Sequence, residues 1–219
     1  MLQTVEQETG ASPQWSIIWL HGLGADGHDF APIVPELVRP HWPALRVVFP
    51  HAPVRPITIN NGVPMRGWYD IVGMDFRSRA DMDGVRASVL ELDALIAREI
   101  ERGIAAERIF LAGFSQGGAV ILTAALARTE PLAGLIALST YLPEAETARR
   151  VDGAVQVPVF MAHGSQDPVI PHAVALHSAD ALRGQGLDVE WHAYPMAHQV
   201  CAEEIHALGD WLQQRLLAG

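Results

Sequence analysis

Gly113-Phe114-Ser115-Gln116-Gly117-Gly118 is the stretch around which the rest of the chain is arranged. An apolar run, residues 108–112, precedes it, and a second apolar run, residues 119–127, follows it directly. A buried strand, a G-x-S-x-G turn and a buried helix are the context of a nucleophile elbow. The glycines of such a turn lack the Cβ atoms that would collide where strand and helix meet. We therefore expect the Ser115 hydroxyl to stand clear of a sheet, at the N-terminal end of a helix where developing negative charge is favoured.

Strand-like and helix-like segments alternate on both sides of this turn. Runs rich in β-branched, aromatic and other apolar residues predict strands at 15–20, 45–49, 108–112, 135–138, 157–162 and 189–194. Helical periodicity predicts helices at 29–38, 81–102, 116–128 and 172–183, and a last one whose apolar stripe includes Cys201 and ends at Leu216. An Asn-Asn-Gly sequence at 60–62 indicates a tight turn of a small hairpin. The alternation predicts an α/β fold with a mostly parallel central sheet flanked by helices.

Composition narrows the class of protein. At 219 residues the chain fits a single domain, residues 1–219, in which residues 1–14 form a polar N-terminal lead-in. The 15 basic residues are all arginine, and the chain has 25 acidic residues. The resulting net charge of −10 argues against a nucleic-acid partner. No run resembles a signal peptide or a membrane span, so we expect no stable membrane insertion. One cysteine excludes an internal disulfide, and we expect a cytoplasmic protein.

Two kinds of chemistry are excluded or disfavoured by residue usage. The absence of lysine excludes Schiff-base catalysis and a P-loop lysine. Ten histidines could suggest zinc, but neither H-E-x-x-H nor a comparable ligand spacing occurs. We therefore expect neither a metal nor another cofactor.

A glycine-rich loop, His21 to Gly27, follows the first predicted strand. Its glycines do not have the G-x-G-x-x-G spacing of a dinucleotide site, so a nucleotide cradle is a poor interpretation. Ahead of a nucleophile elbow, an oxyanion loop fits better, because flexible glycines let a backbone N–H point at a reacting carbonyl oxygen. An ordinary strand-to-helix turn is the alternative.

A serine hydroxyl needs a base within hydrogen-bond reach and a third group that orients the base. In an α/β-hydrolase these follow the serine in the order acid, then histidine, each on a loop after a strand. Of the five aspartates beyond Ser115, only Asp167 comes just after a predicted strand. Of the five histidines beyond Asp167, only His198 lies on a loop after a strand. Chain order thus selects Ser115, Asp167 and His198.

Six segments together resemble one protein family. They are His21-Gly-Leu-Gly-Ala-Asp-Gly-His-Asp-Phe30, Trp68-Tyr69-Asp70, Gly113-Phe-Ser-Gln-Gly-Gly118, Leu138-Ser-Thr-Tyr-Leu-Pro143, His163-Gly-x-x-Asp167 and Tyr194-Pro-Met-x-His198. In this order, across residues 15–214, they are similar to the carboxylesterase/acyl-protein thioesterase (phospholipase/carboxylesterase) family of small α/β-hydrolases. One departure is Ala197, where the family usually has glycine before the histidine.

The resemblance implies the α/β-hydrolase fold without a large lid domain. It implies a catalytic triad of Ser115, Asp167 and His198, which coincides with the selection by chain order. It also implies an oxyanion hole formed by the backbone N–H groups of Leu23 and Gln116, and it is compatible with a homodimer.

The predicted activity is that of a serine carboxylesterase acting on short to medium acyl chains through an acyl-enzyme intermediate. One alternative is an acyl-protein thioesterase or lysophospholipase acting on long acyl chains. A more remote alternative is a non-catalytic binding module on a hydrolase scaffold. The expected partner is a small-molecule or lipid ester. We expect four residues near its acyl group: Leu23, Met65, Trp68 and Phe114.

Overall fold

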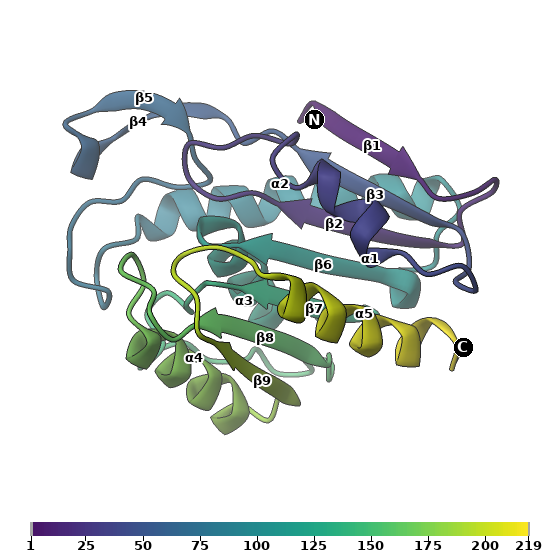
Figure 1. Ribbon diagram of the computed structural model, residues 1–219. Coiled ribbons are helices and arrows are strands. Elements are labelled where there is room, and N and C mark those ends of the chain that lie inside the picture. Colours follow the sequence, from purple (N-terminus) through teal and green to yellow (C-terminus); the bar gives the residue numbers. More distant parts are fainter. Residues whose placement is uncertain (1, 219) are drawn as a thin grey trace.

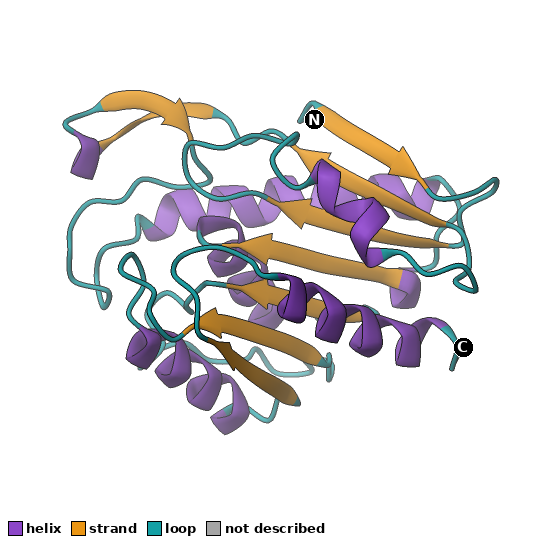
Figure 2. Ribbon diagram, in the orientation of Figure 1, coloured by secondary structure: helices purple, strands orange, loops and turns teal. Residues whose placement is uncertain are grey.

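The computed structural model describes residues 2–218 and is built on one seven-stranded sheet (Figures 1 and 2). Its strands lie in the order β1-β3-β2-β6-β7-β8-β9. Only the β1–β3 pair is antiparallel, and the other five pairs are parallel. The strands are β1 (Thr4–Glu8), β2 (Trp15–Leu20), β3 (Leu45–Pro50), β6 (Ile109–Phe114), β7 (Gly134–Leu138), β8 (Val159–Gly164) and β9 (Val189–Tyr194). The predicted α/β fold with a mostly parallel sheet is confirmed.

Helices cover both faces of the sheet, with α1 and α5 in front and α2 and α3 behind in the view of Figure 1. The α-helices are α1 (Val34–Leu37), α2 (Met82–Glu101), α3 (Gln116–Ala127), α4 (His172–Gly184) and α5 (Ala202–Leu216). Short 3-10 turns span Ala31–Ile33, Thr58–Asn60 and Ala106–Arg108. No helix within residues 2–218 is both long and apolar enough to cross a membrane.

The central strands are buried because each has an apolar layer on both sides. In β2, Ile18 and Leu20 join the core shared with α2, α3 and α4. The alternate residues Ile17 and Trp19 join the core shared with α1 and α5. A strand that contacts two helical layers reads as a continuous apolar run rather than an alternating one, as the sequence here does.

The N-terminal segment differs from the expected polar lead-in, because Thr4–Glu8 forms the edge strand β1. Its pairing with β3 aligns Thr4 with Pro50 and Glu8 with Arg46. Glu8 makes an ion pair with Arg46 at 2.9 Å. Glu6 contacts Arg98 of α2 and Arg102, the C-cap residue of that helix, each at 2.9 Å. The polar residues that suggested a lead-in are thus used for ion pairs at the sheet edge, where charge also discourages pairing with other chains.

A long excursion between β3 and α2 holds the expected hairpin. Strands β4 (Val54–Ile57) and β5 (Val63–Arg66) pair antiparallel, and Asn61 and Gly62 take left-handed φ angles of 55° and 74° at the turn. The chain then runs through residues 67–81, where Ile71 and Ala80 form an isolated bridge. This excursion lies beside the carboxyl end of the sheet (Figure 2).

The elbow depends on glycines for the reason that the sequence indicated. A Cβ at Gly113 would come within 2.5 Å of the backbone of Gly117. A Cβ at Gly117 would strike the carbonyl group of Leu20 on the neighbouring strand β2. Strand β6, strand β2 and helix α3 therefore approach one another closely at this point, which fixes the height of Ser115 above the sheet.

The start of α5 also differs from the expectation. Cys201 was expected to pack on the apolar stripe, but it is half-buried and occupies the N-cap position, where Glu204 completes a capping box. The Glu204 side chain is buried, and its Oε2 accepts a hydrogen bond from the Cys201 N–H at 3.3 Å. Its Oε1 has no hydrogen-bond partner within the described residues. Burial raises the pKa of Glu204 to about 8.

We predict that Gly117→Ala destabilises the fold by about 1–3 kcal/mol or more, because the new methyl group must displace backbone rather than a mobile side chain. Gly184→Ala is the control, since a Cβ there meets nothing within 4 Å at the end of α4, and it should be neutral or stabilising. Urea denaturation measures both. Equal stability of the two variants would contradict the close approach at the elbow.

We predict that Glu204→Gln changes how stability depends on pH. Between pH 4.5 and about 8 the carboxyl of the unfolded chain is ionised while that of the folded chain keeps its proton. The folded state then binds more protons, so wild-type stability falls as pH rises through this window. Glu204→Gln removes that loss, so its melting temperature should exceed the wild-type value increasingly up to pH 8. The exposed neighbour Glu203→Gln should show no such trend.

Candidate active site

Three polar side chains from separate loops meet above the carboxyl ends of the strands. Ser115 follows β6, Asp167 follows β8 and His198 follows β9. The Ser115 hydroxyl lies 2.9 Å from Nε2 of His198, and Nδ1 of His198 lies 2.7 Å from Oδ2 of Asp167. The structure thus brings together the three residues selected by chain order, in a connected hydrogen-bond chain.

Ser115 has a strained backbone that the surrounding structure holds in place. Its φ of 54° and ψ of −117° lie outside the favoured regions for a non-glycine residue. Its N–H donates to the carbonyl of Leu138 at 2.9 Å, and its carbonyl accepts from the Thr140 hydroxyl at 2.6 Å. Both partners belong to the end of β7 and the loop after it, so the neighbouring strand fixes the angle at which the hydroxyl projects.

Asp167 is fixed so that one oxygen is left for the histidine. Its side chain is fully buried, and Oδ1 accepts hydrogen bonds from the N–H groups of Val169 and Ile170 at 2.8 and 2.9 Å. Oδ2 faces His198 and also lies 3.3 Å from Nε2 of His163. Burial lowers the pKa of His163, so this second histidine is neutral and donates from Nε2 to the carbonyl of Ile170 at 2.9 Å.

The two backbone N–H groups expected to form the oxyanion hole are available. Leu23 and Gln116 both line the cavity that contains Ser115. Neither N–H has a hydrogen-bond acceptor among residues 2–218. Unpaired N–H groups beside a serine hydroxyl are the arrangement that stabilises an oxyanion.

Hydrogen bonds from the side chains of Gln116, His21 and Trp68 connect the loops that carry these two N–H groups. Gln116 accepts from the N–H of Trp68 at 2.7 Å and donates to the carbonyl of Tyr69 at 2.6 Å. His21 accepts the N–H of Ala52 on Nε2 at 3.0 Å, so its Nδ1 carries the proton and donates to the carbonyl of Gly22 at 2.7 Å. The Trp68 indole donates to the carbonyl of His21 at 2.8 Å. Elbow, glycine-rich loop and excursion are therefore one connected unit.

A cavity of about 450 Å³ opens onto the Ser115 hydroxyl and His198. Two of the four residues expected near the acyl group, Leu23 and Phe114, line it. Trp68 does not, because it is fully buried beneath the glycine-rich loop, and Met65 lies behind that loop, 3.8 Å from the position of a Cβ at Gly24. Lining residues that sequence reasoning missed include Ile59, Ile71, Arg79, Tyr141, Val169 and Ile170.

Some of the missed residues carried a usable signal and others did not. Tyr141, Val169 and Ile170 come just after strands β7 and β8, at the sheet edge that holds Ser115. Their position after these strands would have been enough to predict that they line the site. Ile71 and Arg79 lie in the long excursion, whose path no periodicity reveals.

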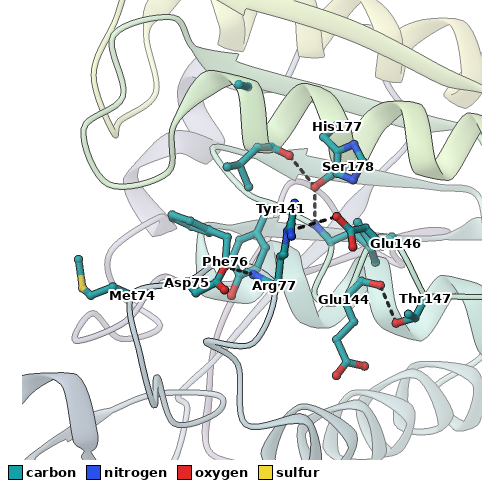
Figure 3. Close-up of a pocket in the computed structure, with 14 residues that line it drawn as sticks. Met74, Asp75, Phe76, Arg77, Tyr141, Glu144, Glu146, Thr147, His177 and Ser178 are labelled. Atoms are coloured by element: carbon teal, nitrogen blue, oxygen red, sulfur yellow. Dashed lines mark hydrogen bonds and ion pairs between the residues drawn. The ribbon is translucent and has the colours of Figure 1, made fainter.

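A larger cavity of about 640 Å³ lies next to this one and does not contain the three polar residues (Figure 3). It is bordered by residues 74–77, residues 141–147 and helix α4. Figure 3 shows Arg77 reaching Glu146, an exposed ion pair of 3.3 Å. Tyr141 lines both cavities. The chemistry belongs to the smaller cavity, because only that one reaches Ser115.

Comparison with protein families gives a match to the model described as Phospholipase/Carboxylesterase, over residues 3–216. The chain belongs to the phospholipase/carboxylesterase family. It is therefore an α/β-hydrolase and a serine hydrolase of carboxylic esters.

Several named proteins and solved structures are similar to this chain along nearly its whole length. Acyl-protein thioesterase 1 of Neurospora crassa is 40% identical, covering 92% of this chain and 86% of that protein. Its namesake in Gibberella zeae is 39% identical, covering 92% and 90%. The crystal structure of Arabidopsis thaliana SOBER1 has a TM-score of 0.85 at 30% identity, covering 92% and 99%. That of Zea mays acyl-protein thioesterase 2 has a TM-score of 0.85 at 25% identity, covering 99% and 100%.

Proposed function

We propose that this family member is a thioesterase and esterase for fatty acyl groups, with Ser115, His198 and Asp167 as its catalytic triad. The observation that carries the proposal is the hydrogen-bond chain from Ser115 through His198 to Asp167, set beside two unpaired backbone N–H groups. A non-catalytic binding module would have no use for this combination, because each part serves only acyl transfer.

The reaction proceeds in two steps. His198 takes the Ser115 proton on Nε2 as the hydroxyl oxygen attacks the carbonyl carbon, and the carbonyl oxygen becomes an oxyanion near the N–H groups of Leu23 and Gln116. The imidazolium then gives its proton to the departing thiol or alcohol, which leaves an acyl-serine. In the second step His198 activates water, which releases the acid and restores the serine. Asp167 orients the imidazole and stabilises its charged form.

Acyl length is where the expected carboxylesterase and its alternative differ. The similar proteins of Neurospora crassa, Gibberella zeae and Mycosarcoma maydis, 37–40% identical, are all named acyl-protein thioesterase 1. The cavity at Ser115 is lined mainly by apolar side chains, including Ile59, Ile71 and Val169, which suits a hydrocarbon chain. Both observations favour the thioesterase alternative over a carboxylesterase of short esters.

We predict that wild-type protein hydrolyses p-nitrophenyl esters and acyl thioesters with rates that rise from acetyl to longer chains, and that Ser115→Ala abolishes turnover without loss of folding. Circular dichroism of the variant provides the folding control. A maximum at acetyl or butyryl would return the assignment to a general carboxylesterase. Inert wild type that a fluorophosphonate fails to label would instead establish the binding module.

We predict that Asp167→Asn lowers kcat by about 10³–10⁴-fold, because the amide can donate to Nδ1 and so favour the wrong imidazole tautomer. Substrate binding should change little, since Asp167 is buried behind His198. The matched control is Asp188→Asn, an exposed aspartate before β9, which should retain wild-type kcat. Steady-state kinetics on one p-nitrophenyl ester measure both. Equal kcat for the two variants would remove Asp167 from the triad.

A further inference from the structure

A positively charged side chain lines the cavity at Ser115 although the proposed acyl transfer does not use it. Arg79 lies near the end of the excursion, shortly before α2. Its carbonyl accepts a hydrogen bond from the N–H of Val72 at 2.8 Å, and the following residue, Ala80, forms the bridge with Ile71. Backbone contacts thus hold Arg79 in place. Its side chain borders the same cavity as Ser115 and His198.

The Arg79 guanidinium has neither an ion pair nor a hydrogen bond within the described part of the chain. The acidic residues nearest in sequence have other partners: Asp81 accepts from the N–H of Asp83, Asp83 pairs with Arg86, and Asp75 accepts from the N–H of Arg77. The Nε of Arg79 is buried without a partner. Arg77, two residues earlier, is by contrast exposed and paired with Glu146.

Aromatic rings hold the guanidinium at the wall between the two cavities. Its central carbon lies 4.4 Å from the ring centre of Phe76 and 6.0 Å from that of Tyr141. Burial raises the pKa of the Tyr69 and Tyr141 hydroxyls, and the positive charge of Arg79 opposes that rise, which places the charge close to both. Ring faces attract a cation but do not accept its N–H groups as a carboxylate does.

We propose that Arg79 forms a subsite for an anionic group of the substrate, a carboxylate or a phosphate, so that the enzyme prefers acyl esters or thioesters that carry such a group. The inference rests on the proposed hydrolase function and names a substrate class for the same site. An arginine fork gives both anions charge-assisted hydrogen bonds. Asp29, the carboxylate that also lines this cavity, is exposed just after the glycine-rich loop, so the cavity is positive on the Tyr141 side.

The anion has two sources, and matched substrate pairs distinguish them. The acyl arm compares mono-p-nitrophenyl adipate with p-nitrophenyl hexanoate. The leaving-group arm compares monohexanoylglycerol 3-phosphate with monohexanoylglycerol. For each pair, the ratio of kcat/KM for the anionic over the neutral ester is measured in wild type, Arg79→Met, Arg79→Lys and the matched control Arg77→Met.

In one arm the ratio should fall by about 10-fold or more in Arg79→Met, since a hydrogen bond to a charged group is lost. Arg79→Lys should recover part of it, and Arg77→Met should keep the wild-type ratio. A fall in the acyl arm places the anion on the acid, and a fall in the other arm places it on the alcohol. Unchanged ratios in both arms would overturn the subsite while leaving the hydrolase intact.

Binding without turnover tests the subsite independently of catalysis. In Ser115→Ala protein, calorimetry should show tighter binding of methyl hydrogen adipate than of methyl hexanoate, and that difference should vanish when Arg79→Met is added. Wild type that hydrolyses neither the anionic nor the neutral esters would sink the proposed function, whereas this binding difference would still stand. Equal binding of the two esters by Ser115→Ala would sink the subsite.

Discussion

The close approach of β2, β6 and α3 at the elbow is the constraint on which the rest of the structure depends. The backbone of Gly117 lies against the carbonyl group of Leu20, and Gly113 lies against the backbone of Gly117. No side chain fits between these elements, so the serine between them must take a φ of 54°. Strain of this kind persists only where packing on all sides over-determines it. Here the strand on one side and the loop after β7 on the other supply that packing.

The elbow also fixes the position of the loops around it, through the side chain of Gln116. The turn that exposes the Ser115 hydroxyl also directs the Gln116 side chain into the protein interior, where it makes hydrogen bonds with the backbone of Trp68 and Tyr69. The excursion is thereby anchored to the elbow, and the Trp68 indole in turn anchors the glycine-rich loop. The buried Gln116 side chain thus supports both the elbow that carries Ser115 and the excursion that borders the cavity. Trp68 is fully buried and does not line the cavity, yet it helps to position the glycine-rich loop that does.

Much of this was predictable from the sequence, and the failures have physical causes. Buried strands and chain order placed Ser115, Asp167 and His198, because the carboxyl ends of parallel strands meet at one edge of a sheet. β1 was missed because its residues are polar, and their partners, Arg46, Arg98 and Arg102, are distant in sequence. Trp68 was misplaced because aromatic character does not reveal whether a ring faces a cavity or the core. Arg79 was missed because loop geometry, not periodicity, sets its position.

The spread of the three polar residues along the chain also bears on biosynthesis. A growing chain has its serine turn after β6, yet the acid arrives only with β8 and the histidine only with β9. The loop that carries His198 is closed by the bond from the Ser139 hydroxyl to the carbonyl of Gln199, and α5 begins three residues later. During translation Ser115 is therefore synthesised long before its base, and a product that stops short of β9 contains six of the seven strands but no His198 to activate the serine.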